Sequence, residues 1–127
     1  GLKVKNIEIS SQADIPAGTG LGSSGSFCTC LLKGLYLLQG KNITTEELAK
    51  TASKIEIEIL KEPVGKQDQY AAAFGGLNHF KFNKDQTVER KPINLDQDLL
   101  RRFSSSIFLY TKVNLARAED PSPKANA

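Results

Sequence analysis

The 127-residue chain contains no methionine, no tryptophan, two cysteines and one histidine. So few thiol and imidazole ligands exclude a structural zinc site, which takes four of them. No apolar run approaches the roughly 18 residues that cross a bilayer, and no basic run is interleaved with aromatic residues. We therefore expect a cytoplasmic protein that has neither a membrane nor a nucleic acid as its partner.

The lack of methionine also bears on the extent of the chain, because a complete translated protein normally starts with one. We expect these residues to be part of a longer protein. With 39% hydrophobic and 24% charged residues, the composition is that of a globular domain. We expect one partial domain over residues 1–115 and an irregular tail over 116–127, where two prolines interrupt a segment without an apolar pattern.

Hydrophobic periodicity predicts several helices and a few strands. Alternation predicts a strand over residues 2–15, and helical spacing of Phe27, Leu31, Leu35 and Leu38 predicts a helix from Ser24 that ends at Gly40. Residues 55–59 alternate like a strand, but they continue a longer frame that starts at a capping box, which favours a helix. The expected elements after residue 40 are a helix from Thr44 to the break at Pro63, a short helix from Gln67 to Phe74, a hairpin of 77–83 with 87–90, a helix over 95–103 and a buried strand over 106–113.

Three side chains with reactive groups receive no functional role. Cys28 and Cys30 lie two positions apart on a predicted helix, where their side chains point about 200° apart and cannot form a disulfide with each other. We expect both to be buried, reduced thiols. His79 falls in a predicted strand, and we expect a partly buried, hydrogen-bonded side chain there.

The glycine-rich run PAGTGLGSSGS at residues 16–26 is the most informative segment. Glycines let backbone N–H groups approach an oxyanion closely, and the serines add hydroxyl donors or a metal ligand. The predicted helix that follows directs the positive end of its dipole to the same place. These properties predict a phosphate-binding loop. The simpler interpretation is a glycine-rich turn with a serine N-cap and no ligand.

Better-known phosphate loops fit this run less well. A Walker A loop ends in Gly-Lys-Ser/Thr, and the run has no lysine. Residues 20–25 match GxGxxG, but a dinucleotide-binding Rossmann unit continues into an apolar strand, whereas residues 39–47 are polar and lead into another helix. An oxidoreductase of that type is therefore an unfavoured alternative. A protein-kinase loop needs a downstream Val-Ala-Ile-Lys strand, which is absent.

Two acids, Glu56 and Asp68, lie twelve residues apart on either side of a break at Pro63 and Gly65. This arrangement allows two carboxylates to approach one cleft from different elements. Phosphoryl transfer from ATP uses such a pair, one to hold Mg²⁺ and one to orient or deprotonate the attacking hydroxyl. Taken alone, Glu56 is more simply explained as part of a solvated helix face, and Asp68 as a helix N-cap.

The full run Pro-x-Gly-x-Gly-Leu-Gly-Ser-Ser at residues 16–24 resembles the second signature motif of the GHMP kinases, which include galactokinase, homoserine kinase and mevalonate kinase. In that family this loop wraps the phosphates of ATP. The resemblance implies ATP and Mg²⁺ as cofactors. The phosphate-binding residues that it implies are Gly18, Gly20, Leu21, Gly22, Ser23 and Ser24.

An acid, a Pro-x-Gly and an Asp-Gln pair follow the loop at offsets similar to those of the family's sugar kinases. By that match Ser24 and Glu56 hold Mg²⁺, and Asp68 is the catalytic carboxylate. The residues around Asp68 are implied to line a pocket for a sugar or sugar phosphate. They are Lys66, Gln67, Gln69 and Tyr70.

Residues 55–78 look most like the D-glycero-D-manno-heptose 7-phosphate kinases within this family. The resemblance covers about residues 3–113 and implies an α+β fold of the GHMP kinase N-terminal-lobe type, similar to domain 2 of ribosomal protein S5, with layered sheet and helices. That fold is incomplete here, because the family's first motif and the C-terminal lobe with its third motif are missing.

The implied activity is transfer of the ATP γ-phosphoryl group to a sugar hydroxyl, most specifically the anomeric hydroxyl of a heptose 7-phosphate. Two alternatives stay open. One is another small-molecule kinase of the family, similar to galactokinase or fucokinase. The other is a catalytically incomplete fragment that binds nucleotide.

Overall fold

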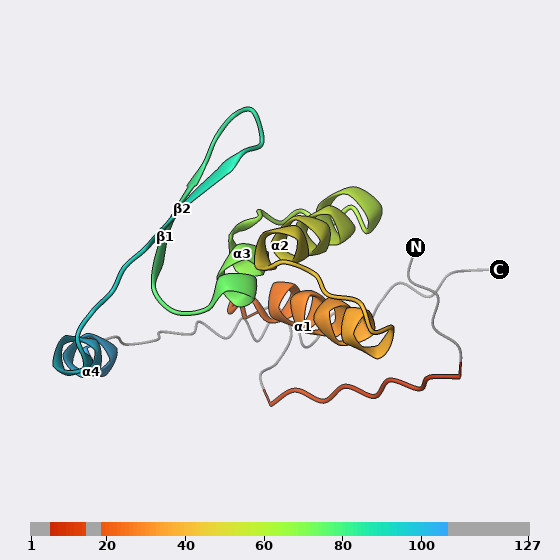
Figure 1. Ribbon diagram of the computed structural model, residues 1–127, viewed down its shortest axis with the longest axis horizontal. Helices are drawn as coiled ribbons and strands as arrows, with labels where there is room; N and C mark the ends of the chain where they lie inside the picture. The colour runs from red at the N-terminus through yellow and green to blue at the C-terminus, as the bar shows by residue number, and fades with distance from the viewer. Residues whose placement is uncertain (1–5, 15–18, 107–127) are drawn as a thin grey trace, which may run out of the picture.

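The computed structural model describes residues 6–14 and 19–106 of the chain (Figure 1). Its regular elements follow one another as three helices, a β-hairpin and a fourth helix, which is an α+β arrangement. In chain order they are α1 (Ser23–Leu38), α2 (Thr45–Lys54), the π-helical turn η1 (Ile55–Ile59), α3 (Gln67–Phe74), β1 (Asn78–Phe82), β2 (Val88–Pro92) and α4 (Gln97–Ser105). The short helix predicted from Gln67 to Phe74 is confirmed with those bounds.

Helices α1, α2 and α3 pack against one another and enclose the core, and the hairpin leads away from them to α4 (Figure 1). The buried side chains of this core are Leu32, Ile43, Leu48 and Ala52. Half-buried groups from α1, η1 and α3 pack around them, among them Cys28 and Ile55. The core therefore lies between α1 and α2, with α3 packed beside it.

The face of α1 that packs is not the predicted one. Phe27 and Leu38, at the two ends of the predicted apolar stripe, are 49% and 66% exposed. The helix is instead buried along Gly25, Thr29 and Leu32. Small residues at the first two of these positions allow a close approach of the neighbouring helix. The Thr29 hydroxyl donates a 2.7 Å hydrogen bond to the Gly25 carbonyl, which satisfies its polar group within the helix.

The predicted capping box of α2 is confirmed. The Thr44 hydroxyl oxygen accepts from the Glu47 amide at 3.2 Å, and the Glu47 carboxylate accepts from the Thr44 amide at 3.2 Å. These two bonds satisfy two backbone donors that the first turn of a helix otherwise leaves free.

The helix that begins at Thr45 widens into η1, where the amide of Leu60 donates to the carbonyl of Ile55 at 2.9 Å. The strand alternative for residues 55–59 is thereby excluded. Ile59, the last residue of this turn, is 65% exposed. A π turn fits an extra residue into one helical turn and so changes which side chains face inward. Here the inward side chain is Glu56, with 1% of its surface exposed.

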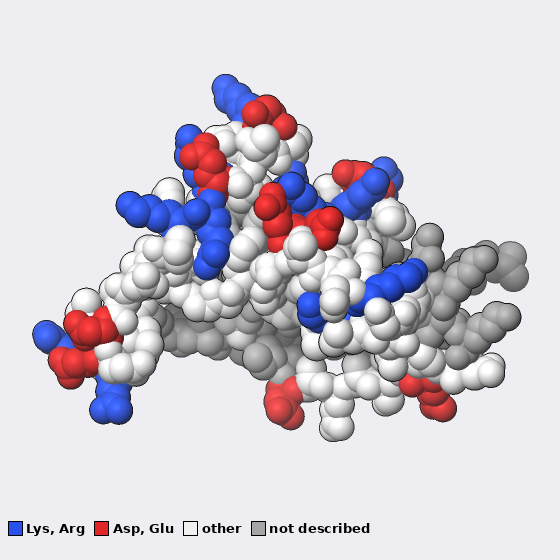
Figure 2. Space-filling view, viewed as in Figure 1, with Lys and Arg blue, Asp and Glu red and all other residues white. Residues whose placement is uncertain are grey.

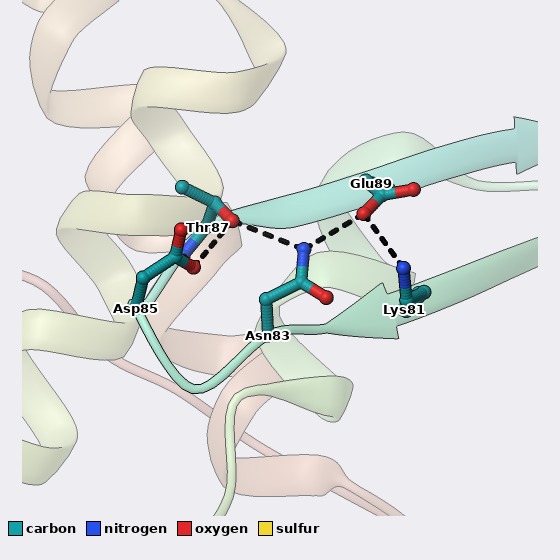
Figure 3. A network of polar contacts seen from close by, with 5 residues as sticks. All are labelled: Lys81, Asn83, Asp85, Thr87 and Glu89. Atoms are coloured by element: carbon teal, nitrogen blue, oxygen red, sulfur yellow. Dashed lines mark hydrogen bonds and ion pairs between the residues drawn. The ribbon is translucent and has the colours of Figure 1, made fainter.

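The predicted hairpin is confirmed as the antiparallel pair β1 and β2, in which Asn78 lies opposite Pro92 and Phe82 opposite Val88. Figure 3 shows the polar network that fixes its turn. The Asp85 carboxylate accepts from the amide and hydroxyl of Thr87 at 3.0 and 2.6 Å. Glu89 accepts from Asn83 at 2.8 Å and pairs with Lys81 at 3.0 Å.

Aromatic side chains join the hairpin to α3. The ring of Tyr70 meets those of Phe80 and Phe82 edge to face, with centroids 5.9 and 5.6 Å apart. Phe74 stacks on Tyr70 at 6.2 Å and carries the guanidinium of Arg90 4.7 Å above its own ring. Such pairs each add about 0.5–1.5 kcal/mol beyond the area they bury. These contacts hold the hairpin against α3.

Several predictions at the edges of the structure differ from it or fall outside it. Residues 6–14 form no strand, and Ile7 and Ile9 are 42% and 52% exposed. A half-buried strand needs a neighbouring strand, and β1 and β2 are the only two paired within residues 6–14 and 19–106. The helix predicted over 95–103 is found as α4, which Asp96 caps. The strand predicted over 106–113 and the tail over 116–127 lie outside the described residues, apart from Ser106 at the end of α4.

The thiols and the histidine are more exposed than predicted. Cys28 is half-buried and Cys30 is exposed, and both are free. His79 lies in β1 as predicted, but its side chain is exposed. Neither Cys30 nor His79 belongs to the buried core or to the half-buried residues packed against it.

The visible face of the molecule mixes the two signs of charge over the helices and the hairpin (Figure 2). Two surface ion pairs contribute to this mixture, Lys50 with Glu46 at 2.7 Å and Lys81 with Glu89 at 3.0 Å. Among the described residues, no helix has both the length and the apolar character needed to cross a membrane.

Candidate active site

The glycine-rich loop leads into α1 through a left-handed residue. Gly22, the N-cap of the helix, has φ 69° and ψ 21°, a conformation that costs a residue with a side chain about 1–2 kcal/mol. No side chain caps this helix end, and its first turn contains no acidic residue. The positive end of the helix dipole and the free N–H groups of the first turn are therefore available to an anion.

Ser24 and Glu56 meet at this end of α1, although they are 32 residues apart in the sequence. The Ser24 hydroxyl donates a hydrogen bond to Oε1 of Glu56. The side-chain amide of Gln69 donates to the other carboxylate oxygen, Oε2. Glu56 and Gln69 are each 1% exposed and are the largest fully buried side chains within residues 6–14 and 19–106. One buried carboxylate thus connects α1, η1 and α3.

Asp68 lies beside the same helix end, because α3 approaches α1 at its glycines. A Cβ atom built on Gly25 would lie 2.8 Å from Cβ of Asp68. One built on Gly22 would lie 3.1 Å from Cγ of Asp68. The structure therefore brings together the residues predicted to bind phosphate, hold the metal and act on the acceptor. Gly18 of the predicted loop lies outside the described residues, and Leu21 is 36% exposed at the entrance to α1.

The residues predicted to line the sugar pocket do not share one surface. The Lys66 ammonium donates to the side-chain carbonyl of Gln86 in the hairpin turn. Lys66 and Tyr70 line a cavity of about 260 Å³ between the end of α2, η1 and this turn. Burial raises the pKa of the Tyr70 phenol, and the nearby Lys50 ammonium partly opposes that rise. Gln67 is exposed at the start of α3, whereas Gln69 turns inward to Glu56.

Gly25 is the site residue that sequence reasoning missed. It is not among the predicted phosphate-binding positions, yet a Cβ atom on Gly25 would lie closer to Asp68 than one on Gly22. A signal for it existed, because glycine is unfavourable in a helix by about 1 kcal/mol relative to alanine. A glycine in the first turn of a predicted helix suggests that another backbone or side chain approaches there.

The donor set at this place fits a hard divalent cation. The Ser24 hydroxyl and the Glu56 carboxylate supply oxygen ligands, which Mg²⁺ prefers. Burial of a carboxylate is costly without a counter-charge, and neither ion pair found among the described residues involves Glu56. The same residues contain no group of three or more His, Cys, Asp and Glu side chains placed to hold a metal. Such a small ligand set suits Mg²⁺, which proteins usually bind through one or two carboxylates together with substrate phosphates and water.

Comparison with known proteins gives a consistent result. The family model for the N-terminal domain of GHMP kinases matches residues 1–76. D-glycero-alpha-D-manno-heptose 7-phosphate kinase of Campylobacter jejuni is 31% identical over 85% of this chain and 32% of its own length. Galactokinase of Pyrococcus furiosus is 33% identical over 89% of this chain and 31% of its own length.

A solved structure shares the fold as well as the sequence. The crystal structure of a D-glycero-D-manno-heptose 1-phosphate kinase from Bacteriodes thetaiotaomicron aligns with a TM-score of 0.66 at 36% identity, over 69% of this chain and 29% of the other. The chain spans about a third of the length of the curated relatives that it matches. The family match covers more than half of the chain, and the fold agrees with it. The chain therefore belongs to the GHMP kinase family.

Proposed function

We propose that the protein transfers the γ-phosphoryl group of ATP to the anomeric hydroxyl of D-glycero-D-manno-heptose 7-phosphate. The observation that carries the proposal is the position of Asp68 against Gly22 and Gly25, at the helix end where Ser24 meets Glu56. A group that can accept a proton thus lies beside a place suited to phosphate. The heptose 7-phosphate kinase and heptose 1-phosphate kinase among the relatives support the choice of sugar.

In the proposed mechanism, the loop from Gly20 to Ser24 and the free N–H groups of α1 bind the phosphates of ATP. Gly18, earlier in the same loop, is assigned to that set by the family motif. Ser24 and Glu56 hold Mg²⁺, which when bound neutralises negative charge on the phosphates. These groups fix the γ-phosphoryl group in place relative to the acceptor, and positioning and charge stabilisation supply most of the catalysis of this reaction.

Asp68 takes the proton of the acceptor hydroxyl. As the sugar oxygen forms its bond to the γ-phosphorus, the bond between that phosphorus and the β,γ-bridging oxygen breaks, ADP leaves, and the proton remains on the Asp68 carboxylate. An anomeric hydroxyl is more acidic than an ordinary alcohol, so a carboxylate is a strong enough base for this step. Lys66 and Gln67 are proposed to bind the sugar phosphate. Tyr70 has only 3% of its surface exposed and packs on Phe80 and Phe82, so it offers a ligand little surface.

Galactose is the second candidate acceptor, because the galactokinase of Pyrococcus furiosus is as similar in sequence as the heptose kinase. The test is to assay the full-length protein with ATP and Mg²⁺ against heptose 7-phosphate, galactose and fucose. We expect the highest kcat/KM with heptose 7-phosphate. A higher value with galactose or fucose would assign a different acceptor. If the protein binds ATP but phosphorylates none of the three sugars, the proposed kinase activity is wrong and nucleotide binding is its function.

A further inference from the structure

We propose that Gln69 is a positioning residue for the metal ligand Glu56 and does not contact the sugar. This inference rests on the proposed role of Glu56 in holding a divalent cation. It assigns to Gln69 a function different from the sugar contact that its place beside Asp68 suggests. Three features of the described residues carry it: the direction of the Gln69 amide, its burial, and its place in α3.

The direction of the amide is set by the Glu56 carboxylate. The N–H of Gln69 reaches Oε2, while the Ser24 hydroxyl reaches Oε1. Each oxygen therefore has one protein donor, and the plane of the carboxylate is fixed by two helices at once. Hydrogen bonds of this kind to a metal-binding group set its orientation and its basicity.

Burial removes Gln69 from contact with a sugar. Only 1% of its surface is exposed, which leaves almost nothing for a ligand to touch. Its amide oxygen Oε1 is also buried and has no hydrogen-bond partner among the described residues. An apolar side chain of the same volume would fill this space without leaving a buried acceptor unpaired. The bond to Glu56 is therefore the polar interaction that this side chain provides.

The position of Gln69 in α3 links the two carboxylates. Gln69 directly follows Asp68, and its own backbone nitrogen would lie 3.3 Å from a Cβ on Gly25. The helical turn that carries Asp68 against α1 thus also carries the donor that orients Glu56. We infer that this one turn sets the distance between the group that accepts a proton and the group that holds the metal.

The test measures the affinity of the full-length protein for Mn²⁺ in the presence of a non-hydrolysable ATP analogue. Electron paramagnetic resonance detects the bound and free Mn²⁺. This measurement needs no sugar and no turnover. Gln69→Met keeps the volume and removes the donor, and we expect it to weaken Mn²⁺ binding by about 10–100-fold. Gln97→Met makes the same change at an exposed position on α4 and should leave binding unchanged. If Gln69→Met fails to fold, Gln69→Asn is the second variant. Its shorter side chain keeps an amide but moves it away from the Glu56 carboxylate, so Mn²⁺ binding should again weaken.

A double-mutant cycle separates this inference from the proposed function. In a Glu56→Ala background, Gln69→Met should weaken Mn²⁺ binding no further, because its effect passes through the missing carboxylate. Unchanged Mn²⁺ binding in Glu56→Ala alone would contradict the metal role proposed for Glu56. If Glu56→Ala weakens Mn²⁺ binding but Gln69→Met does not, Gln69 is not a positioning residue. A raised KM for the sugar with unchanged Mn²⁺ binding would also overturn the inference, in favour of a sugar contact.

Discussion

Gly25 of α1 and Asp68 of α3 lie so close that a methyl group on Gly25 would overlap the Asp68 side chain. A Cβ atom at residue 25 would lie 2.8 Å from Cβ of Asp68 and 3.3 Å from the Asp68 carbonyl carbon. Neither atom is the free end of a flexible side chain, so relief would require the two helices to move apart. The absence of a side chain at residue 25 thus determines how near Asp68 comes to the start of α1.

Gly25→Ala should therefore destabilise the protein and reduce its activity. Overpacking of this kind costs about 1–3 kcal/mol, against which alanine regains at most about 1 kcal/mol of helix propensity. A displacement of about 1 Å of a reacting group can lower the rate about 100-fold. Urea unfolding would give the change in stability, and kcat would report the displacement of Asp68.

Gly34→Ala is the matched control on the same helix. A Cβ at Gly34 would have no neighbour within 4 Å, so the substitution adds helix propensity without a clash. We expect a gain of about 0.5–1 kcal/mol in the free energy of unfolding and an unchanged kcat. A stabilising effect at both positions would show that α1 and α3 do not approach as closely as described.

Asp68→Asn should remove most of the turnover while the fold is kept. The amide has nearly the same shape, and the Asp68 atoms nearest to Gly22 and Gly25 are Cγ and Cβ, which asparagine also has. It cannot take a proton from the acceptor hydroxyl, so kcat should fall by about 100–10,000-fold, the usual contribution of a general base. The Kd for ATP with Mg²⁺, measured by calorimetry, should change little. Full turnover in a correctly folded variant would contradict the role of Asp68.

The residues of the candidate site could be predicted from sequence wherever the chemistry is local. The loop, the helix behind it and the capping box at Thr44 each depend on neighbours within a few positions, and the helix from Gln67 to Phe74 was found with its bounds. The pair of Glu56 with Ser24 was implied by the family motif, and the structure brings the two side chains together.

What could not be predicted depends on contacts between distant elements. Nothing in residues 55–59 indicates a π turn, so the burial of Glu56 follows only from its packing against α1 and α3. The prediction for the buried face of α1 is wrong because a pattern of apolar residues does not include Gly25 and Thr29. Small residues at these positions allow a close contact between helices. For Ile7 and Ile9, alternation predicted a strand, but pairing depends on a partner strand as well.

Removal of the α2 cap should destabilise the helix that leads to Glu56. Thr44→Ala loses the acceptor for the Glu47 amide, which costs about 1 kcal/mol at a typical N-cap. Hydrogen bonds from the side chain and then the backbone of Thr44 lower the pKa of Glu47. The ionised Glu47 carboxylate therefore stabilises the folded protein at pH values above its ordinary pKa. This stabilisation is lost as the pH falls through the lowered pKa that Glu47 has in the folded protein. In urea unfolding, the free energy of unfolding of the variant should decrease less than that of the parent as the pH falls from 7 to 3. An unchanged pH profile would contradict the capping box of Thr44 and Glu47.

The two thiols of α1 should react at different rates, although they are two residues apart. Burial, and secondly the negative charge of Glu56, raise the pKa of the Cys28 thiol, whereas Cys30 is exposed. Thiolate is the reactive form, so iodoacetamide at pH 8 should modify Cys30 first. Mass spectrometry of the Cys28→Ser and Cys30→Ser variants gives each rate separately. The difference should shrink in urea, and equal rates in the folded protein would contradict the half-buried position of Cys28.

The raised pKa of Cys28 also predicts how stability changes in base. Between the ordinary thiol pKa and the raised one, the unfolded chain has lost the Cys28 proton while the folded chain still keeps it. The folded state then binds more protons, so the free energy of unfolding must fall as the pH rises through this interval. Cys28→Ala removes the titrating group and should flatten the alkaline part of the pH profile, measured by urea unfolding between pH 7 and pH 10. Cys30→Ala is the matched control, and an equal flattening in both variants would show that burial beside Ala52 and the charge of Glu56 do not act on Cys28 specifically.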